Sequence, residues 1–317
     1  MRRKITSMLV ALVLCMLITG CRDGSSNDLA VNNSMTEDGT NVNQVSDNGV
    51  GEVTNNFNPD DVGKTFVEGE YEYTVLGDGT AKLIAYSGTA KELRLPEILN
   101  GYPISVIGTY CMSGNDTVVE LTVPGTVKIL EKHSISGALA LKDLVLEEGV
   151  EVIEFEALPL WQLTSLDLPS SLVRVDEYLA SRFESRDLLE CYNGIYYAGT
   201  IACGVDRNTF DVNNVTFKDN TTGISGHFWM EAENDMEMQK LVIPNGVKFI
   251  GEAAFYEAGY RAYEIPDSVK GIGYMAIGYT EVNWESVALT NLKIYGKANT
   301  EIERYAKEHG FTFVTIN

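Results

Sequence analysis

A short apolar motif recurs along residues 93–294 and limits the folds that this chain can adopt. In each copy an apolar residue, a variable residue and a second apolar residue follow one another, and proline often comes next. Alternation with a period of two predicts a short strand, and proline ends it because proline has no N–H to donate to a neighbouring strand. Copies without an insertion between them lie 22 or 23 residues apart. The copies begin at Leu93, Leu121, Leu144, Leu166, Val215, Leu241, Tyr263 and Leu292.

A second pattern follows each predicted strand at a fixed distance. In its clearest copy Val247, Ile250 and Gly251 precede a small residue, Ala254, and a large apolar residue, Phe255. The aligned small positions hold Cys111, Ser134, Ala157, Ala254 and Ala276, and the large ones hold Met112, Ile135, Leu158, Trp229, Phe255 and Ile277. Burying each large side chain contributes roughly 1.5–3 kcal/mol, but only when a neighbouring coil covers it. The pattern therefore predicts stacked coils that share one continuous core.

This register resembles the BspA-like class of bacterial leucine-rich repeats over about residues 66–317. The resemblance implies a mainly β fold, a right-handed leucine-rich-repeat solenoid of short parallel strands with short helical turns. Such stacks need polar ends that cover the terminal coils. Residues 70–83 predict an N-terminal hairpin cap. Residues 300–316 predict a small α/β C-terminal cap, with a capping box that starts at Thr300 and a helix that ends at Gly310.

Residues 170–214 depart from the repeat, and an extra hairpin is predicted as an insertion near residues 188–214. Cys191 and Cys203 flank this hairpin. They either form a disulfide across it or remain free thiols, because an exported chain permits a disulfide but this one has few cysteines. Cys111 falls in the small core column and is expected to be an inert buried thiol.

The N-terminus has the features of an export signal. Residues 1–4 carry three positive charges, and residues 5–18 form an uncharged, mostly apolar run that is too short to span a membrane. The run ends in Leu17-Ile18-Thr19-Gly20-Cys21, which resembles a bacterial lipobox. We expect a signal peptide over residues 1–20 and lipidation of Cys21, which would hold the chain on the outer face of the bacterial membrane. Residues 21–65 are polar and nearly free of aromatic residues, so they predict a disordered tether.

The charge of the chain limits its partners. The formal net charge is −21 at pH 7. Nucleic-acid backbones and anionic lipids both bind through lysine and arginine, so they would repel such a chain. We therefore expect no nucleic-acid partner and contact with a membrane only through the lipid anchor.

The sequence holds no motif that is typical of a catalytic, cofactor or metal site. His133, His227 and His309 lie far apart, without the spacing of zinc ligands. Residues 223–227 resemble the turn that carries a hydrolase serine, but His227 stands where that turn needs glycine. We therefore expect no metal, no cofactor and no enzymatic activity.

The leading hypothesis is a cell-surface module that binds an extracellular or host protein, or a glycan. Tyr196, Tyr197, Tyr256 and Tyr260 are candidate anchors on the surface, because tyrosine combines apolar area with a polar tip. The variable strand positions would line one face of the stack. We call this set the strand row: Arg94, Thr122, Val145, Asp167, Thr216, Val242, Glu264 and Lys293.

Two alternatives remain at this point. The resemblance to BspA-like proteins implies adhesion, but a structural envelope spacer or a self-assembling surface component would have the same repeats. The third reading is a hydrolase with a site in residues 180–235, which would use His227, Asp206 or Cys203.

Overall fold

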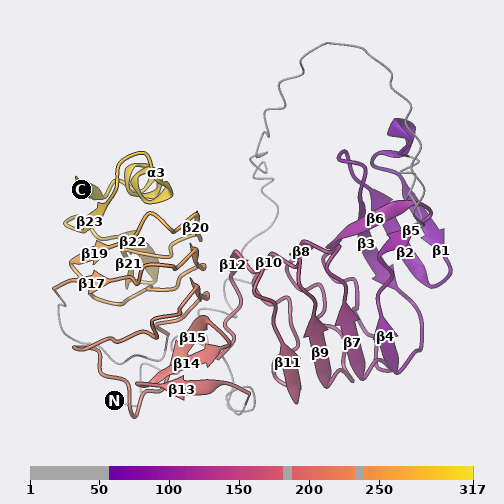
Figure 1. The fold of residues 1–317 in the computed structure, drawn as a ribbon, viewed down its shortest axis with the longest axis horizontal. Coiled ribbons are helices and arrows are strands. Elements are labelled where there is room, and N and C mark those ends of the chain that lie inside the picture. Colours follow the sequence, from indigo (N-terminus) through magenta and orange to yellow (C-terminus); the bar gives the residue numbers. More distant parts are fainter. Residues whose placement is uncertain (1–56, 181–187, 231, 233–238, 317) are drawn as a thin grey trace, which may run out of the picture. The chain divides into compact units, whose positions relative to one another are not determined.

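The computed structural model describes residues 57–180, 188–230, 232 and 239–316 (Figure 1). They form the mainly β repeat fold that the sequence predicts. In the first half, each coil gives one strand to a parallel sheet with the order β11-β9-β7-β4, in which the repeat leucines lie opposite one another. Its strands are β4 (Glu92–Arg94), β7 (Glu120–Val123), β9 (Asp143–Leu146) and β11 (Ser165–Asp167).

The same coils give a second strand to another sheet, in which these strands pair in parallel. A run of turns follows each of these strands, in the place where short helical turns are expected. At one turn position the backbone is left-handed in six coils, and His133 and His227 share this position. The strands are β6 (Tyr102–Ile107), β8 (Ile129–Leu130), β10 (Val152–Ile153) and β12 (Arg174–Val175). The left-handed residues are Tyr110, His133, Glu156, His227, Ala253 and Met275.

The second half of the chain repeats this arrangement with two further sheets. One contains the parallel strands that follow the Val-x-x-Ile pattern: β16 (Gly223–Ile224), β18 (Phe249–Ile250) and β20 (Gly271–Ile272). The other has the parallel order β17-β19-β23-β24. Its strands are β17 (Leu241–Val242), β19 (Ala262–Glu264), β23 (Lys293–Gly296) and β24 (Thr312–Thr315).

The predicted strand at residues 215–217 is wrong, because this segment has no strand structure. It follows the insertion, and its backbone is held by side chains and turns rather than by a parallel neighbour. Thr216 Oγ1 donates to the Asn214 carbonyl at 3.4 Å, and the Lys218 N–H donates to Tyr197 Oη at 2.9 Å. Phe217 still enters the core, so the apolar pattern predicts burial correctly at this residue but not strand pairing.

The segment near residues 188–214 contains three antiparallel strands. The last of them pairs in parallel with β16, so the segment extends a sheet of the second half. The turn after β16 also approaches the coil of β12, and the Gly226 N–H donates to the Val175 carbonyl at 2.9 Å. A Cβ at Gly226 would lie 2.1 Å from the Asp176 carbonyl oxygen, so this contact requires glycine. The strands are β13 (Glu190–Tyr192), β14 (Ile195–Ala198) and β15 (Ile201–Val205).

Residues 57–65, which composition assigns to the tether, are folded instead. Asn58 Oδ1 accepts from the Asp60 N–H at 3.1 Å, and Tyr102 Oη donates to Asp61 Oδ2 at 2.8 Å. The second contact comes from a distant part of the chain, which composition cannot reveal. Elements at this end are η1 (Pro59–Asp61), β1 (Thr65–Glu68), β2 (Tyr71–Val75), β3 (Ala81–Tyr86) and β5 (Ile98–Leu99).

The C-terminal end contains the helix α3 (Glu301–Glu308) and, before it, the hairpin of β21 (Tyr279–Val282) and β22 (Glu285–Ala288). The predicted capping box at Thr300 is wrong. The Thr300 hydroxyl donates to the Lys297 carbonyl at 2.6 Å instead of capping the helix, while Glu303 accepts from the Asn299 N–H at 2.6 Å. A preceding turn therefore competes for the groups that would form the box. Gly310 is left-handed after the helix, with φ +72°.

Both predicted columns lie in the core. Every residue of the small column and of the large column is buried. Trp229 and Phe255 are packed among other aromatic rings, with 6.1 Å between their ring centroids. The side-chain sizes at these two positions therefore explain how each coil fills the space between its neighbours.

Candidate interaction surface

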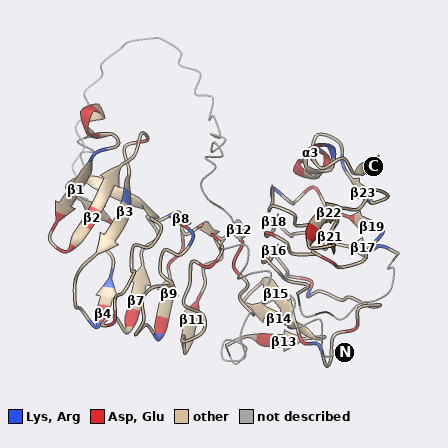
Figure 2. Cartoon of the chain, turned by 180° about the vertical axis from the view of Figure 1, so that it is seen from behind, with Lys and Arg blue, Asp and Glu red and all other residues tan. Residues whose placement is uncertain are grey.

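The predicted strand row is present in the first half of the stack. Arg94 lies opposite Thr122, Thr122 opposite Val145, and Val145 opposite Asp167. Arg94 and Asp167 are exposed, and the other two are half-buried. The Arg94 guanidinium donates to Glu97 Oε1 at 2.8 Å and also to Glu147. The row therefore carries charged, hydroxyl and aliphatic groups side by side. Figure 2 shows further acidic residues on β7 and β9, outside the row.

In the second half, the register corrects the predicted row. Val242 lies opposite Glu264, as expected, but Glu264 lies opposite Tyr295 and not opposite Lys293. Lys293 is exposed two residues earlier, opposite Ala262, and Thr216 is exposed outside any strand. The sequence missed Tyr295 because Leu292 to Ile294 imitates the repeat motif, whereas the pairing places Ile294 opposite Tyr263.

Tyr295 belongs to a small polar group on this sheet. Lys240 Nζ lies 2.7 Å from Glu264 Oε2 and 5.7 Å from the centroid of the Tyr295 ring. The group therefore combines a cation, a carboxylate and an aromatic ring, and each of these can contact a protein surface.

Of the four tyrosines predicted as surface anchors, two are buried. Tyr197 is 1% exposed and Tyr260 is 3% exposed, so their predicted place on the surface is wrong. Tyr197 Oη accepts from the Lys218 N–H at 2.9 Å, and Tyr260 Oη donates to the Val212 carbonyl at 3.2 Å. Both tyrosines thus hold the loop that follows β15. Tyr196 and Tyr256 are half-buried and remain predicted anchors.

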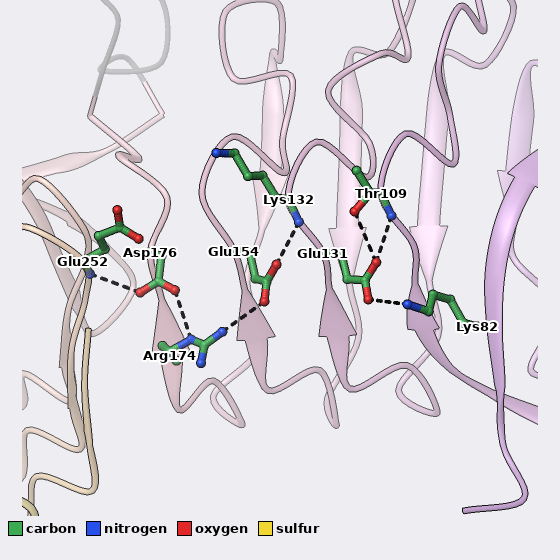
Figure 3. A network of polar contacts seen from close by, with 8 residues as sticks. All are labelled: Lys82, Thr109, Glu131, Lys132, Glu154, Arg174, Asp176 and Glu252. Atoms are coloured by element: carbon green, nitrogen blue, oxygen red, sulfur yellow. Dashed lines mark hydrogen bonds and ion pairs between the residues drawn. The ribbon is translucent and has the colours of Figure 1, made fainter. Parts of the chain in front are cut away.

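A ladder of carboxylates joins successive coils on the other sheet (Figure 3). Glu131 Oε2 accepts from the Thr109 N–H at 3.0 Å, and Glu154 Oε2 accepts from the Lys132 N–H at 3.0 Å. Each glutamate thus binds the backbone of the preceding coil. Lys82 Nζ lies 2.7 Å from Glu131 Oε1. The sequence contains a sign of this ladder, because Glu131 and Glu154 stand where other copies of the repeat have glycine.

The ladder ends where the irregular segment joins the two halves (Figure 3). Arg174 bridges Glu154, at 3.2 Å, and Asp176, at 3.0 Å. Asp176 Oδ1 accepts from the Glu252 N–H at 3.1 Å, a contact across 76 residues of chain. Burial raises the pKa of Asp176, and Arg174 lowers it by a smaller amount. These contacts join the coil of β12 to the turn after β18.

Glu177 is the most strongly perturbed acid at the junction. Burial raises its pKa to about 8, although Glu177 Oε2 accepts from the Leu158 N–H at 3.3 Å. The desolvation of a charged carboxylate outweighs that hydrogen bond, so the folded chain holds Glu177 protonated at neutral pH.

The three residues that a hydrolase site would use are engaged in packing or in local hydrogen bonds. Burial lowers the pKa of His227 to about 4, and its ring packs 5.2 Å from the Phe155 ring. Such an imidazole is a weak base at neutral pH. Cys203 is a free, buried thiol that donates to the Tyr196 carbonyl at 3.3 Å, and burial raises its pKa. Asp206 Oδ2 accepts from Thr209 Oγ1 at 2.9 Å within a turn.

Cys191 is exposed and free, so no disulfide joins it to Cys203 in this structure. Burial raises the pKa of Cys111 to about 12, as expected for a thiol in the core column. Within the described residues, no three His, Cys, Asp or Glu side chains are placed to hold a metal ion.

The repeat itself decides the family. A family model described as the BspA type leucine rich repeat region matches in six copies, over residues 105–234 and 232–306. This is more than half of the chain. The chain belongs to the BspA-type leucine-rich-repeat family.

Solved structures include similar repeat proteins. A leucine rich cell surface protein from Faecalibacterium prausnitzii is 18% identical, with 74% of this chain and 76% of that chain covered and a TM-score of 0.38. A leucine rich repeat protein from T. pallidum is 15% identical, with 79% and 98% covered and a TM-score of 0.35. No curated protein matches this BspA-type chain.

The predicted export features lie outside the described residues. They comprise the signal peptide over residues 1–20, the lipidation site at Cys21 and the part of the tether before residue 57. In the described residues of this BspA-type chain, no helix is long and apolar enough to cross a membrane.

Proposed function

We propose that this BspA-type protein is an exported module that binds an extracellular protein or a glycan through its strand row. The observation that carries the proposal is the row Arg94–Thr122–Val145–Asp167, which places four chemically different side chains on successive strands of a continuous stack. Neighbouring strands lie about 4.8 Å apart, so the row spans about 14 Å. A row of this length and mixed polarity suits a macromolecular surface better than a small-molecule pocket.

The export and anchoring of the chain are part of the same proposal. The lipobox-like residues before Cys21 would place the protein on the outer face of the membrane. We expect the wild-type chain to fractionate with membranes and to incorporate labelled fatty acid. The Cys21→Ser variant should incorporate none and should leave the membrane fraction. Fatty-acid labelling that persists in Cys21→Ser would refute lipidation at this residue.

The binding proposal is tested with the full chain carrying Cys21→Ser, applied to an array of glycans and extracellular-matrix proteins. We expect saturable binding to at least one component. The same sample is measured by sedimentation at several concentrations. A folded protein that binds nothing on the array but associates with itself would favour the structural alternative, a self-assembling surface component, over the binding proposal.

A further inference from the structure

The hairpin of β21 and β22 presents an exposed tryptophan at its tip. Val282 pairs with Glu285, so Asn283 and Trp284 form a two-residue turn. Both are left-handed, with φ values of +52° and +69°. This is the pattern of a turn that favours Asn followed by Gly, because glycine adopts positive φ without strain. Trp284 occupies the glycine position, and its side chain is 67% exposed.

Two other hairpins of this chain show what the turn normally holds. Asn100 and Gly101 join β5 to β6, with φ values of +47° and +89°. Asn193 and Gly194 join β13 to β14, with φ values of +50° and +76°. All three turns begin with asparagine. Of the three, the turn between β21 and β22 alone has a bulky side chain, that of Trp284, where the others have glycine. The exposed ring gains little from burial and strains the backbone, so folding does not explain it.

The hairpin is held on the stack both near its tip and at its base. Tyr256 Oη and Ser286 Oγ share a hydrogen bond of 2.8 Å, and the Glu257 N–H donates to the Tyr279 carbonyl at 2.9 Å. Tyr279 Oη lies 2.6 Å from His309 Nδ1. These contacts fix the strands of the hairpin on the stack, so a partner that binds Trp284 would need to order little backbone.

The surface around the ring is apolar and negative. Successive side chains of a strand point to opposite faces, so the bond of Ser286 to Tyr256 turns one face of the hairpin toward the stack and leaves Val282 and Val287 on the other. Both valines are exposed. Residues 271–292 contain two acids, Glu281 and Glu285, and no lysine or arginine (Figure 2). Glu285 pairs with Val282 and lies on the face of the valines, whereas Glu281 pairs with Ser286 and lies on the opposite face. Within the described part of the chain, neither acid has an ion-pair partner.

We propose that Trp284, together with Glu285, is a docking point for a cationic segment of a partner protein. A guanidinium or ammonium group is attracted to the face of an indole ring, and an adjacent carboxylate adds to this attraction. The net charge of −21 also draws a basic partner toward the chain and disfavours an anionic membrane or a second copy. The docking point is separate from the strand row, but it rests on the proposed function in treating the chain as a binding protein.

Fluorine NMR of the full chain, labelled with fluorotryptophan, tests this proposal. The three tryptophans report separately, because Trp161 is exposed elsewhere and Trp229 is buried. A short peptide that alternates arginine with glycine and serine should shift the Trp284 signal and leave the other two unchanged. The Glu285→Gln variant should bind at least about threefold more weakly, and Glu281→Gln, on the other face, provides the matched control. A matched glutamate peptide should have no effect. Equal shifts of Trp161 and Trp284, or a shift of Trp284 by the glutamate peptide or by a neutral oligosaccharide alone, would overturn the proposal.

A relocated tryptophan provides the matched control. Trp284→Gly gives the turn its preferred residue, and Gly101→Trp is sterically open because no atom lies within 4 Å of a Cβ at Gly101. Trp284→Gly and the double variant Trp284→Gly/Gly101→Trp should each bind the arginine peptide about tenfold more weakly than the wild type. Trp284→Gly should unfold at the same temperature or a higher one. Undiminished peptide binding by either variant, or a lower unfolding temperature for Trp284→Gly, would overturn the proposal.

The strand-row variant Thr122→Lys/Val145→Lys separates this docking point from the proposed function. It should bind the arginine peptide as the wild type does. If it also loses binding to the array while Trp284→Gly keeps peptide binding, then the strand row stands and the docking point falls. If Trp284→Gly loses peptide binding while the wild type binds nothing on the array, then the docking point stands without the row.

Discussion

Replacing Phe255 by alanine should destabilise the protein by about 3–5 kcal/mol. Phe255 is 1% exposed and belongs to the large column. Its ring centroid lies 5.6 Å from that of Phe228, 6.1 Å from that of Trp229 and 5.5 Å from that of Tyr263. Removing the ring would leave a cavity between coils, and rigid aromatic neighbours can collapse into it only in part.

Urea unfolding measures this loss, and the fluorescence of Trp229 reports it directly because Trp229 contacts the deleted ring. The control is Tyr274→Ala, since Tyr274 is exposed and its loss should change the free energy of unfolding by no more than about 0.5 kcal/mol. A loss below about 1 kcal/mol for Phe255→Ala would mean that the stacked columns do not carry the stability of the fold.

The free energy of unfolding should fall as the pH rises from about 5 to 8, because Glu177 must lose a proton inside the fold. Its pKa is raised from 4.5 to about 8 by burial, so the folded state binds this proton more tightly than the unfolded state does. The stabilisation is complete below about pH 4.5 and is lost as the pH rises through about 8. The full difference is up to about 5 kcal/mol.

Urea unfolding at a series of pH values tests this effect in the wild type and in Glu177→Gln. Glutamine keeps the shape of the side chain and an oxygen that can accept from the Leu158 N–H, but it has no proton to lose. The variant should therefore show a much weaker pH dependence and should exceed the wild type in stability at pH 8. A remaining slope of the same sign is expected, because burial also raises the pKa of Asp176 and Glu252. Parallel pH profiles for the two proteins would contradict the protonated state of Glu177.

The sequence predicts the repeat fold well because the pattern is local and repeated. Each coil needs a small residue, a large residue and two apolar strand positions at fixed spacing, and each copy supports the others. Leu121 and Leu144 pair as the alignment predicts, and Ala254 and Phe255 are buried as their columns require. Where the pattern is incomplete, only three-dimensional contacts settle the structure.

The errors share that cause. Tyr197 and Tyr260 look like surface residues from composition, but each is buried beside a loop that no pattern places. Residues 57–65 look like a tether, although Tyr102 holds them through Asp61. The pairing of β19 with β23 places Tyr295 in the row. The motif at Leu292 to Ile294 predicts Lys293 there instead, because it shifts the alignment by two residues.

Trp284 is a feature that the structure reveals and the sequence patterns do not indicate. The dipeptide Asn-Trp carries no turn signal by itself, so sequence patterns did not single it out. Only the left-handed backbone and the comparison with Asn100-Gly101 reveal that a glycine position holds an exposed ring.

The most direct test of the account measures the dissociation constant of an array ligand for three proteins: the wild type, the strand-row variant Thr122→Lys/Val145→Lys, and the matched control Thr65→Lys/Val67→Lys. The control residues are exposed on β1, away from the row. We predict that the strand-row variant binds at least about tenfold more weakly, because two lysines block the contact surface, while the control binds like the wild type. Equal dissociation constants for all three proteins, with each one folded, would contradict the claim that the strand row is the binding surface.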